Sequence, residues 1–334
     1  MGRVDTVSIE TLRQLAHLDV SNLNGREVPF HPLHDGAKWH LWIVNNDKLI
    51  PITAIPVESC YFSTATVGEH DLYVLFLDFL QQRAMWPDVA RFVNGIEADV
   101  RNAGASLAKV RLIYDFAPLD ASRMIVTEIE YVFLTCRSIF DLMQEIMVRL
   151  WDKVRLKDST IKKAQLPSSY RKMVLREDKP MSAEEIAQRF GLPTEIAVIY
   201  AASTPFFLWL RAYRDLVAHS GHTVEHVLST EKGFAIFKFN RPFRDMDIWT
   251  GANSLPNDLG SALSVIAHVL MTTFATCDGL VAALSRVIGF PPPIAPKHKI
   301  FICGPHLENL AGLQGMVRDK PWYDAPPKHG SETR

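Results

Sequence analysis

The fold of this chain is decided by residues 121–156, ASRMIVTEIEYVFLTCRSIFDLMQEIMVRLWDKVRL. Apolar residues recur there in alternating steps of four and three, at Ile125, Ile129, Val132, Cys136, Ile139, Met143, Ile146 and Leu150. A second apolar row follows at steps of seven, at Val126, Phe133, Phe140, Met147 and Val154. Together the rows form one broad apolar face on a long helix, which has to pack against other helices. Asp120 is predicted to cap the start of this helix.

Another apolar segment, from about Pro256 to Val287, predicts a second long helix, interrupted only by His268, Asp278 and Arg286. Its length would suit a membrane span, but a carboxylate in the middle favours a buried helix of a soluble protein. The four cysteines are far apart in the sequence and form no Cys-x-x-Cys pair, which is typical of a reducing compartment. We therefore expect a cytoplasmic protein without a membrane partner.

A charged motif ends a third predicted helix. Residues 206–218, FFLWLRAYRDLVA, are apolar with few helix breakers, and Gly221 follows where a left-handed cap would stop a helix. Arg211, Asp215 and His219 follow one another at i, i+4 spacing, so that Asp215 can orient or charge His219. Arg214 lies about 140° round the helix from His219. These two side chains meet only if the last turn unwinds or a second chain contributes.

The motif R-D-x-x-x-H at residues 214–219, together with CRSIFDL at residues 136–142, resembles the HEPN superfamily (higher eukaryotes and prokaryotes nucleotide-binding) over roughly residues 106–290. The resemblance implies a mainly α fold with a HEPN-like helical bundle, and a homodimer whose paired motifs cleave RNA without metal or cofactor. Arg214, Asp215 and His219 are then the catalytic residues. Family members act in defence or stress response, where a protein antitoxin or regulator can be a partner.

The chemistry implied by this resemblance uses both histidines of a dimer. One takes the proton of a ribose 2′-hydroxyl, the other protonates the leaving 5′-oxygen, and the arginines stabilise the charged phosphorane. Candidates for supporting this site are Glu130, Arg137, Asp141 and Arg211; an ordinary i, i+4 ion pair between Arg137 and Asp141 is the alternative. Because the superfamily includes inactive members, a non-catalytic module that binds nucleotides or proteins is the second interpretation of the chain.

The distribution of charge supports RNA binding in one segment of the chain only. The whole chain has a formal charge of −1, which argues against binding nucleic acid by bulk electrostatics. From Arg149 to Lys179, however, ten lysines and arginines stand against four acids, a net of +6. Side chains predicted to bind single-stranded RNA in this segment are Lys162, Lys163, Tyr170, Arg171 and Lys172, with Tyr170 stacking on a base. A basic loop that is simply solvated is the alternative.

A helix-turn-helix DNA-binding regulator is a third, weaker interpretation. Residues 182–185, SAEE, form a capping box, and the turn at residues 191–194, GLPT, separates two predicted helices. The following residues 195–200, EIAVIY, contain none of the Arg, Lys, Asn or Gln side chains that read base edges. We therefore expect a helical hairpin that carries the chain to the motif helix.

The sequence divides into three parts: an N-terminal α+β extension at residues 1–105, the HEPN-like bundle at 106–290, and a proline-rich tail at 291–334. The extension is predicted to contain a hairpin (38–44 and 48–55), a strand (61–67) and helices at 71–82 and 87–103. A second hairpin is predicted at 224–228 and 234–239, and a short helix at about 306–316, with a disordered C-terminal end. His31, His34, Asp35 and His40 lack helical ligand spacing, so no metal site is expected.

Overall fold

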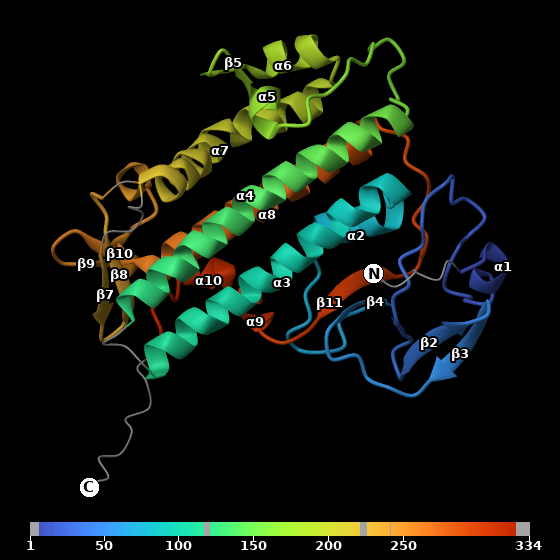
Figure 1. Ribbon diagram of the computed structural model, residues 1–334, viewed down its shortest axis with the longest axis horizontal. Coiled ribbons are helices and arrows are strands. Elements are labelled where there is room, and N and C mark those ends of the chain that lie inside the picture. Colours follow the sequence, from blue (N-terminus) through green and yellow to red (C-terminus); the bar gives the residue numbers. More distant parts are fainter. Residues whose placement is uncertain (1–6, 117–120, 221–225, 241, 325–334) are drawn as a thin grey trace, which may run out of the picture. The chain divides into compact units, whose positions relative to one another are not determined.

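The computed structural model describes residues 7–116, 121–220, 226–240 and 242–324, without the side chains of residues 217–220 and 245. The chain is a mixed α and β protein with substantial helical content. Its contacts gather into two compact units: unit 1 contains Met1–Ala98, Asp141–Ala202 and Thr276–Leu307, and unit 2 contains Asp99–Phe140, Ser203–Ala275 and Glu308–Arg334. Long helices contribute a segment to each unit, namely α3 (Pro87–Phe116), α4 (Ser122–Lys153), α7 (Thr194–Ser220) and α8 (Ala262–Val287) (Figure 1).

The helix predicted from residues 121–156 is confirmed as α4, and every member of its two apolar rows is buried. Within unit 2, Phe133 of α4 meets Tyr213 of α7 with ring centroids 4.5 Å apart, and Phe140 meets Phe206 at 6.0 Å. These contacts show that the two helices run antiparallel. The other long helices join them in the same unit, because Ser106 of α3 donates a hydrogen bond to Glu128 of α4 and Phe206 contacts His268 of α8.

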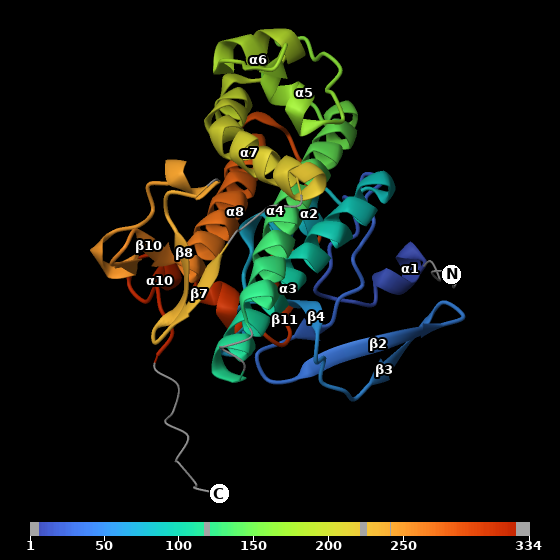
Figure 2. The ribbon, with the colours of Figure 1, turned by 60° about the vertical axis from the view of Figure 1, so that its left-hand side comes forward.

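Unit 1 contains a sheet in the order β11-β4-β1-β2-β3. The predicted hairpin is confirmed as β2 (Trp39–Asn45) and β3 (Lys48–Ile52), joined by Asn46 and Asp47 in the left-handed region, the backbone of a type I′ turn. β4 (Ser59–Ser63) starts and ends earlier than the predicted strand, pairs in parallel with β1 (Leu33–His34), and pairs antiparallel with β11 (Lys299–Cys303). β11 thus comes from the segment assigned to the tail. Figure 2 shows the β2–β3 hairpin.

The remaining elements of unit 1 are short. α1 (Ile9–Leu12) and α2 (Leu75–Arg83) belong to the N-terminal segment. α5 (Tyr170–Val174), β5 (Leu175–Arg176), β6 (Lys179–Pro180) and α6 (Ala183–Phe190) precede α7. The predicted capping box starts α6, and Gly191 ends it at φ +58°, where an added Cβ would lie 1.9 Å from the carbonyl oxygen of Lys162. Glycine is therefore required at this turn.

Unit 2 contains a second sheet in the order β7-β8-β10-β9. β7 (Val227–Thr230) and β8 (Gly233–Phe237) confirm the predicted hairpin. The prediction that the last long helix begins near Pro256 is wrong, because residues on either side of that proline form β9 (Ser254–Leu255) and β10 (Leu259–Ser261). Asn257 and Asp258 both have positive φ and make the tight turn between these strands, so α8 starts only at Ala262.

The C-terminal segment packs into unit 2. Two short helices, α9 (Glu308–Ala311) and α10 (Leu313–Arg318), replace the single predicted helix, because the chain turns at Gly312. Ser264 of α8 donates a hydrogen bond to the carbonyl of Met316 at 3.1 Å, and the amide of Tyr323 donates to the carbonyl of Lys232 at 2.9 Å. Two 3₁₀ turns, η1 (Phe243–Asp245) and η2 (Gly251–Asn253), complete the unit.

Two helices are longer than predicted. α3 continues to Phe116 rather than ending near Ala103, and α7 begins at Thr194 rather than at Phe206. α7 contains Pro205, which removes one backbone donor without ending the helix. The predicted cap Asp120, the predicted stop Gly221 and the last ten residues lie outside the described part of the chain.

Candidate functional site

The R-D-x-x-x-H motif lies at the C-terminal end of α7, in unit 2. α7 runs without a break to Ser220, so that Arg211, Arg214, Asp215 and the backbone of His219 belong to one helix, within its last three turns. This confirms the predicted helical spacing. The carbonyl groups at this end point out of the helix without partners further along it and favour a cation nearby.

A buried aromatic column holds this part of α7 in place. Tyr213 is fully buried and packs edge-on against Phe133 of α4, while Trp209 stacks beside Tyr213 and donates its indole N–H to the carbonyl of Pro242 at 2.8 Å. Arg211 and Asp215 lie two residues before and after Tyr213, roughly 160° from it around the helix. The packing of Tyr213 therefore turns the charged side of the motif away from the helix contacts.

Asp215 lies between two guanidinium groups. One of its carboxylate oxygens is 3.7 Å from Nε of Arg211, and the other is 3.7 Å from Nη1 of Arg214. Both distances are longer than the 2.7–2.9 Å of a charge-assisted hydrogen bond. The side chains of Arg214 and Asp215 are 58% and 42% exposed, and exposed ion pairs contribute little free energy. A phosphate group can therefore compete with Asp215 for Arg214 at small cost.

The third motif residue, His219, cannot be placed beyond its backbone. Its peptide unit belongs to the last turn of α7, while its side chain lies outside the described residues. The interaction of His219 with Asp215 remains a prediction from helical spacing. Because α7 stays helical to Ser220, His219 and Arg214 could meet only if a second chain contributes one of them.

Of the proposed supporting residues, Arg137 has the most informative contact. Its guanidinium lies over the ring of Phe207 of α7, 4.4 Å from the centroid, one turn before Arg211. Glu130 is half-buried, and this burial raises the pKa of its carboxyl against the opposing effect of Arg123. Asp141 belongs to unit 1. Arg137 thus helps to position α7, and roles for Glu130 and Asp141 at the motif remain predictions.

The predicted RNA-binding side chains belong to unit 1, and the structure corrects one of them, Tyr170. Tyr170 is 0% exposed and packs against Tyr200, so it is not available to stack on a base. Lys163 donates hydrogen bonds to the carbonyls of Trp151 and Val154, where it neutralises the C-terminal end of α4. Arg171 forms an ion pair with Asp178. Lys162 and Lys172 are exposed, as the prediction requires.

Sequence reasoning missed Asp99 of α3. Its carboxyl is half-buried in unit 2 and accepts a hydrogen bond from Ser138 of α4, and burial raises its pKa. The spacing of Val93, Ile96 and Val100 could have identified it, since Asp99 follows Ile96 by three residues and so lies beside the buried face of α3. Asp99 is a polar group inside the helical part of unit 2.

Within the described residues, no group of three or more His, Cys, Asp and Glu side chains could hold a metal ion. The four cysteines are free and buried. His34 and His40 lie in β1 and β2, and His40 forms a hydrogen bond with Asp35 at 2.6 Å.

No protein-family model, curated protein sequence or solved structure matches this chain. Two helical stretches, Thr194–Leu216 and Ala262–Val287, are long and apolar enough to cross a membrane by length and composition alone. About half of the most apolar window of each helix is buried inside the structure, 44% and 50%, so these two helices are weak evidence of a membrane span.

Proposed function

We propose that this chain is a metal-independent endoribonuclease of the HEPN type, in which Arg214, Asp215 and His219 form half of a dimeric site. One observation carries the proposal: α7 presents an exposed Arg214 and Asp215 on one helix whose last turn contains His219. The packing of α7 with α3, α4 and α8 in unit 2 is consistent with the helical bundle of that superfamily.

The chemistry follows from the residue types. The imidazole of one His219 accepts the proton of a ribose 2′-hydroxyl, whose oxygen attacks the adjacent phosphorus. The imidazolium of the second His219 protonates the 5′-oxygen as its bond to phosphorus breaks, and Arg214 stabilises the additional negative charge. The products are a 2′,3′-cyclic phosphate and a free 5′-hydroxyl. Because each chain has one motif histidine, the proposed site needs two chains.

Exposed apolar side chains in unit 2 support the proposal of a second chain. Exposed apolar side chains of α4, Met124, Tyr131 and Leu134, lie within about 80° of its circumference, and Leu112 of α3 is also exposed. Exposed apolar patches on soluble proteins commonly mark interaction sites. We assign this patch to a second copy of the chain, since a single copy has only half of the proposed site.

A cytoplasmic role in defence or stress response, on single-stranded RNA and under control of a protein antitoxin or regulator, belongs to the same proposal. The DNA-binding interpretation has less support, because Ile196, Ala197 and Tyr200 of α7 are buried and this turn contains no Arg, Lys, Asn or Gln to read bases.

The test is cleavage of a labelled single-stranded RNA by the full chain, with and without EDTA. We expect His219→Ala and Arg214→Ala to lower the rate by at least about 100-fold, and the products to end in 2′,3′-cyclic phosphate. His226→Ala is the matched control, because His226 is an exposed histidine outside the motif. RNA bound without cleavage by the wild type would favour the non-catalytic binding module. Cleavage that survives His219→Ala would refute the assignment.

The two-chain site is tested separately. Adding an excess of the His219→Ala chain to a fixed amount of wild type should reduce cleavage as mixed dimers form. Leu134→Glu should shift the protein toward monomer in sedimentation and reduce cleavage in parallel. A monomeric wild type that cleaves RNA at full rate would exclude the dimeric mechanism.

A further inference from the structure

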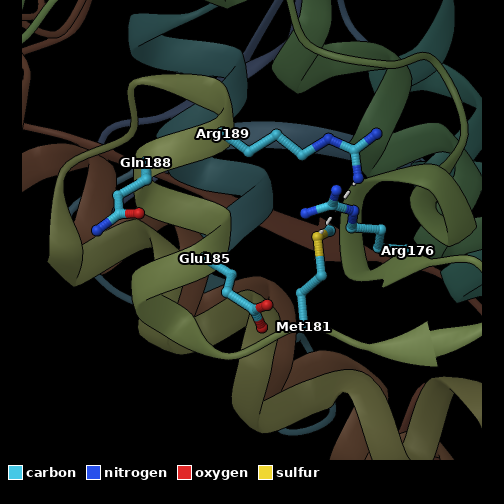
Figure 3. A pocket seen from close by; sticks show the side chains of 5 residues that line it. All are labelled: Arg176, Met181, Glu185, Gln188 and Arg189. Carbon is cyan, nitrogen blue, oxygen red and sulfur yellow. Dashed lines mark hydrogen bonds between the residues drawn. The ribbon is translucent and has the colours of Figure 1, made fainter.

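A pocket of about 440 Å³ lies in unit 1 between the β5–β6 hairpin and α6, lined by Arg176, Met181, Glu185, Gln188 and Arg189. Figure 3 shows the guanidinium groups of Arg176 and Arg189 turned toward the sulfur of Met181. The two arginines come from different elements, β5 and α6, which the turn at β6 brings together. The volume of this pocket falls in the range of small-molecule sites.

The contacts of the two guanidinium groups leave their charge uncompensated. Arg189 donates to the sulfur of Met181 at 3.5 Å and lies over the ring of Phe190, 5.3 Å from the centroid. Within the described part of the chain, neither Arg176 nor Arg189 forms an ion pair with a carboxylate. A thioether is a weak acceptor, so the donors of both arginines are available to a stronger one.

The acidic groups nearby already have partners. Glu185 accepts a hydrogen bond from the amide of Ser182 at 2.7 Å in the capping box that starts α6. Asp178, in the turn between β5 and β6, pairs with Arg171. The lining of the pocket therefore carries two positive charges and one negative charge, which is a net charge of +1.

We propose that this pocket binds the phosphate group of a small phosphorylated molecule. Arg176 and Arg189 are exposed and line one space, so an anion bound there would be attracted by both guanidinium groups. The planar donor fork of arginine matches the oxygens of phosphate in a bidentate geometry, and a phosphomonoester carries about −1.5 to −2 charges at pH 7. Gln188 adds an amide donor at the rim. The pocket is independent of the motif on α7 and goes beyond the proposed cleavage of RNA.

The test is titration calorimetry of the full chain in phosphate-free buffer with three probes: inorganic phosphate, ribose 5-phosphate and AMP. We expect saturable binding at one site. For all three probes, the affinity should depend on Arg176 and Arg189 to the same degree. Arg176→Gln and Arg189→Gln should each weaken binding about tenfold or more, because each removes charge-assisted hydrogen bonds. Thermal unfolding of each variant should match the wild type, which separates lost binding from lost folding.

Two further variants sharpen the result. Glu185→Gln keeps the acceptor of the capping box and removes the negative charge from the pocket, so it should tighten binding by about two- to fivefold. Lys179→Gln is the matched control, because Lys179 is exposed on β6 opposite Arg176 and does not line the pocket; its affinity should stay within about twofold. Absence of saturable binding for all three probes, unchanged affinity in both arginine variants, or weaker binding in Glu185→Gln would overturn the proposal. An equal loss in Lys179→Gln would do the same, since it would indicate diffuse electrostatic attraction.

Discussion

The carboxylate of Asp278, in the middle of α8, accepts a hydrogen bond from the backbone amide of Phe76, in the first turn of α2, at 3.1 Å. α2 has no side-chain cap of its own, since its N-cap residue is Val74. Asp278 therefore satisfies a helix N-terminus that lies 202 residues away in the sequence. This contact gives a structural reason for the one carboxylate inside an otherwise apolar helix segment.

Replacing Asp278 should separate its hydrogen bond from its charge. Asp278→Ala leaves the amide of Phe76, a fully buried residue, without its partner and should destabilise the protein by about 1 kcal/mol. Asp278→Asn keeps an acceptor oxygen for this amide and lacks the buried charge, so it should be more stable than Asp278→Ala at neutral pH. The measurement is chemical unfolding of both variants at several pH values.

The pH dependence has a defined sign. Burial raises the pKa of Asp278, against the opposing effect of the bond from Phe76. The folded protein therefore holds this proton more tightly than the unfolded chain, and the associated stability is lost as pH rises through the raised pKa. Asp278→Asn should gain stability relative to the wild type over that interval. A constant difference between the two at every pH would contradict the assignment.

Gly191 offers a second test of the fold. Gly191→Ala should destabilise the protein by more than about 1 kcal/mol, because the residue has φ +58° and the new Cβ would lie 1.9 Å from the carbonyl oxygen of Lys162. Gly315→Ala, in α10, has nothing within 4 Å of the new Cβ and should be neutral or slightly stabilising. Thermal unfolding compares the two. Equal melting temperatures for both variants would show that α6 does not end in the observed conformation.

Elements with local patterns could be predicted from the sequence. The 4-3 apolar spacing around Ile139 identified α4, and the Asn46-Asp47 turn identified the hairpin of β2 and β3. The pairing of β11 with β4 could not be predicted in this way, because Ile300 meets Phe62 across 238 residues of sequence and no local signal specifies the partner. Likewise, the apolar pattern predicted that the last long helix begins near Pro256, but Asn257 and Asp258 form a turn there instead.

At the candidate site, too, only the features set by local spacing could be predicted from the sequence. Helical spacing predicted that Arg211 and Asp215 are neighbours, and the structure confirms it, with Nε of Arg211 3.7 Å from the Asp215 carboxylate. Tyr170 was misinterpreted, because a tyrosine in a basic segment gives no sign of whether its ring is buried. Arg176 and Arg189 line the same pocket because the β5–β6 hairpin lies beside α6. Their spacing in the sequence does not show this.

His17 should make unit 1 sensitive to acid. Burial, followed by the nearby His298 and His40, lowers the pKa of His17 to about 4, well below its ordinary value of 6.5. The unfolded chain therefore binds a proton that the folded protein resists, and stability is lost as pH falls from about 6.5 to about 4. Burial also lowers the pKa of His298, which acts in the same direction.

His17→Phe should flatten this dependence, because phenylalanine keeps the ring packing against Trp42 and Phe62 and cannot be protonated. Unfolding midpoints at pH 7 and pH 5 measure the effect. His70→Phe is the control, since His70 is an exposed histidine outside this cluster. A variant that loses as much stability as the wild type between the two pH values would contradict the role of His17.

Asp215→Asn should separate RNA binding from cleavage under the proposed function. The carboxylate lies 3.7 Å from both Arg211 and Arg214 and offsets part of their charge, so its removal should strengthen RNA binding and steepen its dependence on salt. Cleavage should fall by at least about tenfold, because the neutral amide no longer favours the charged form of His219 one turn later. Asp247→Asn, at an exposed acid outside the motif, is the control for a general change in charge. Filter binding and single-turnover cleavage measured on the same RNA give the two quantities separately, and a variant that binds more weakly while cleaving at the wild-type rate would exclude phosphate recognition by these arginines.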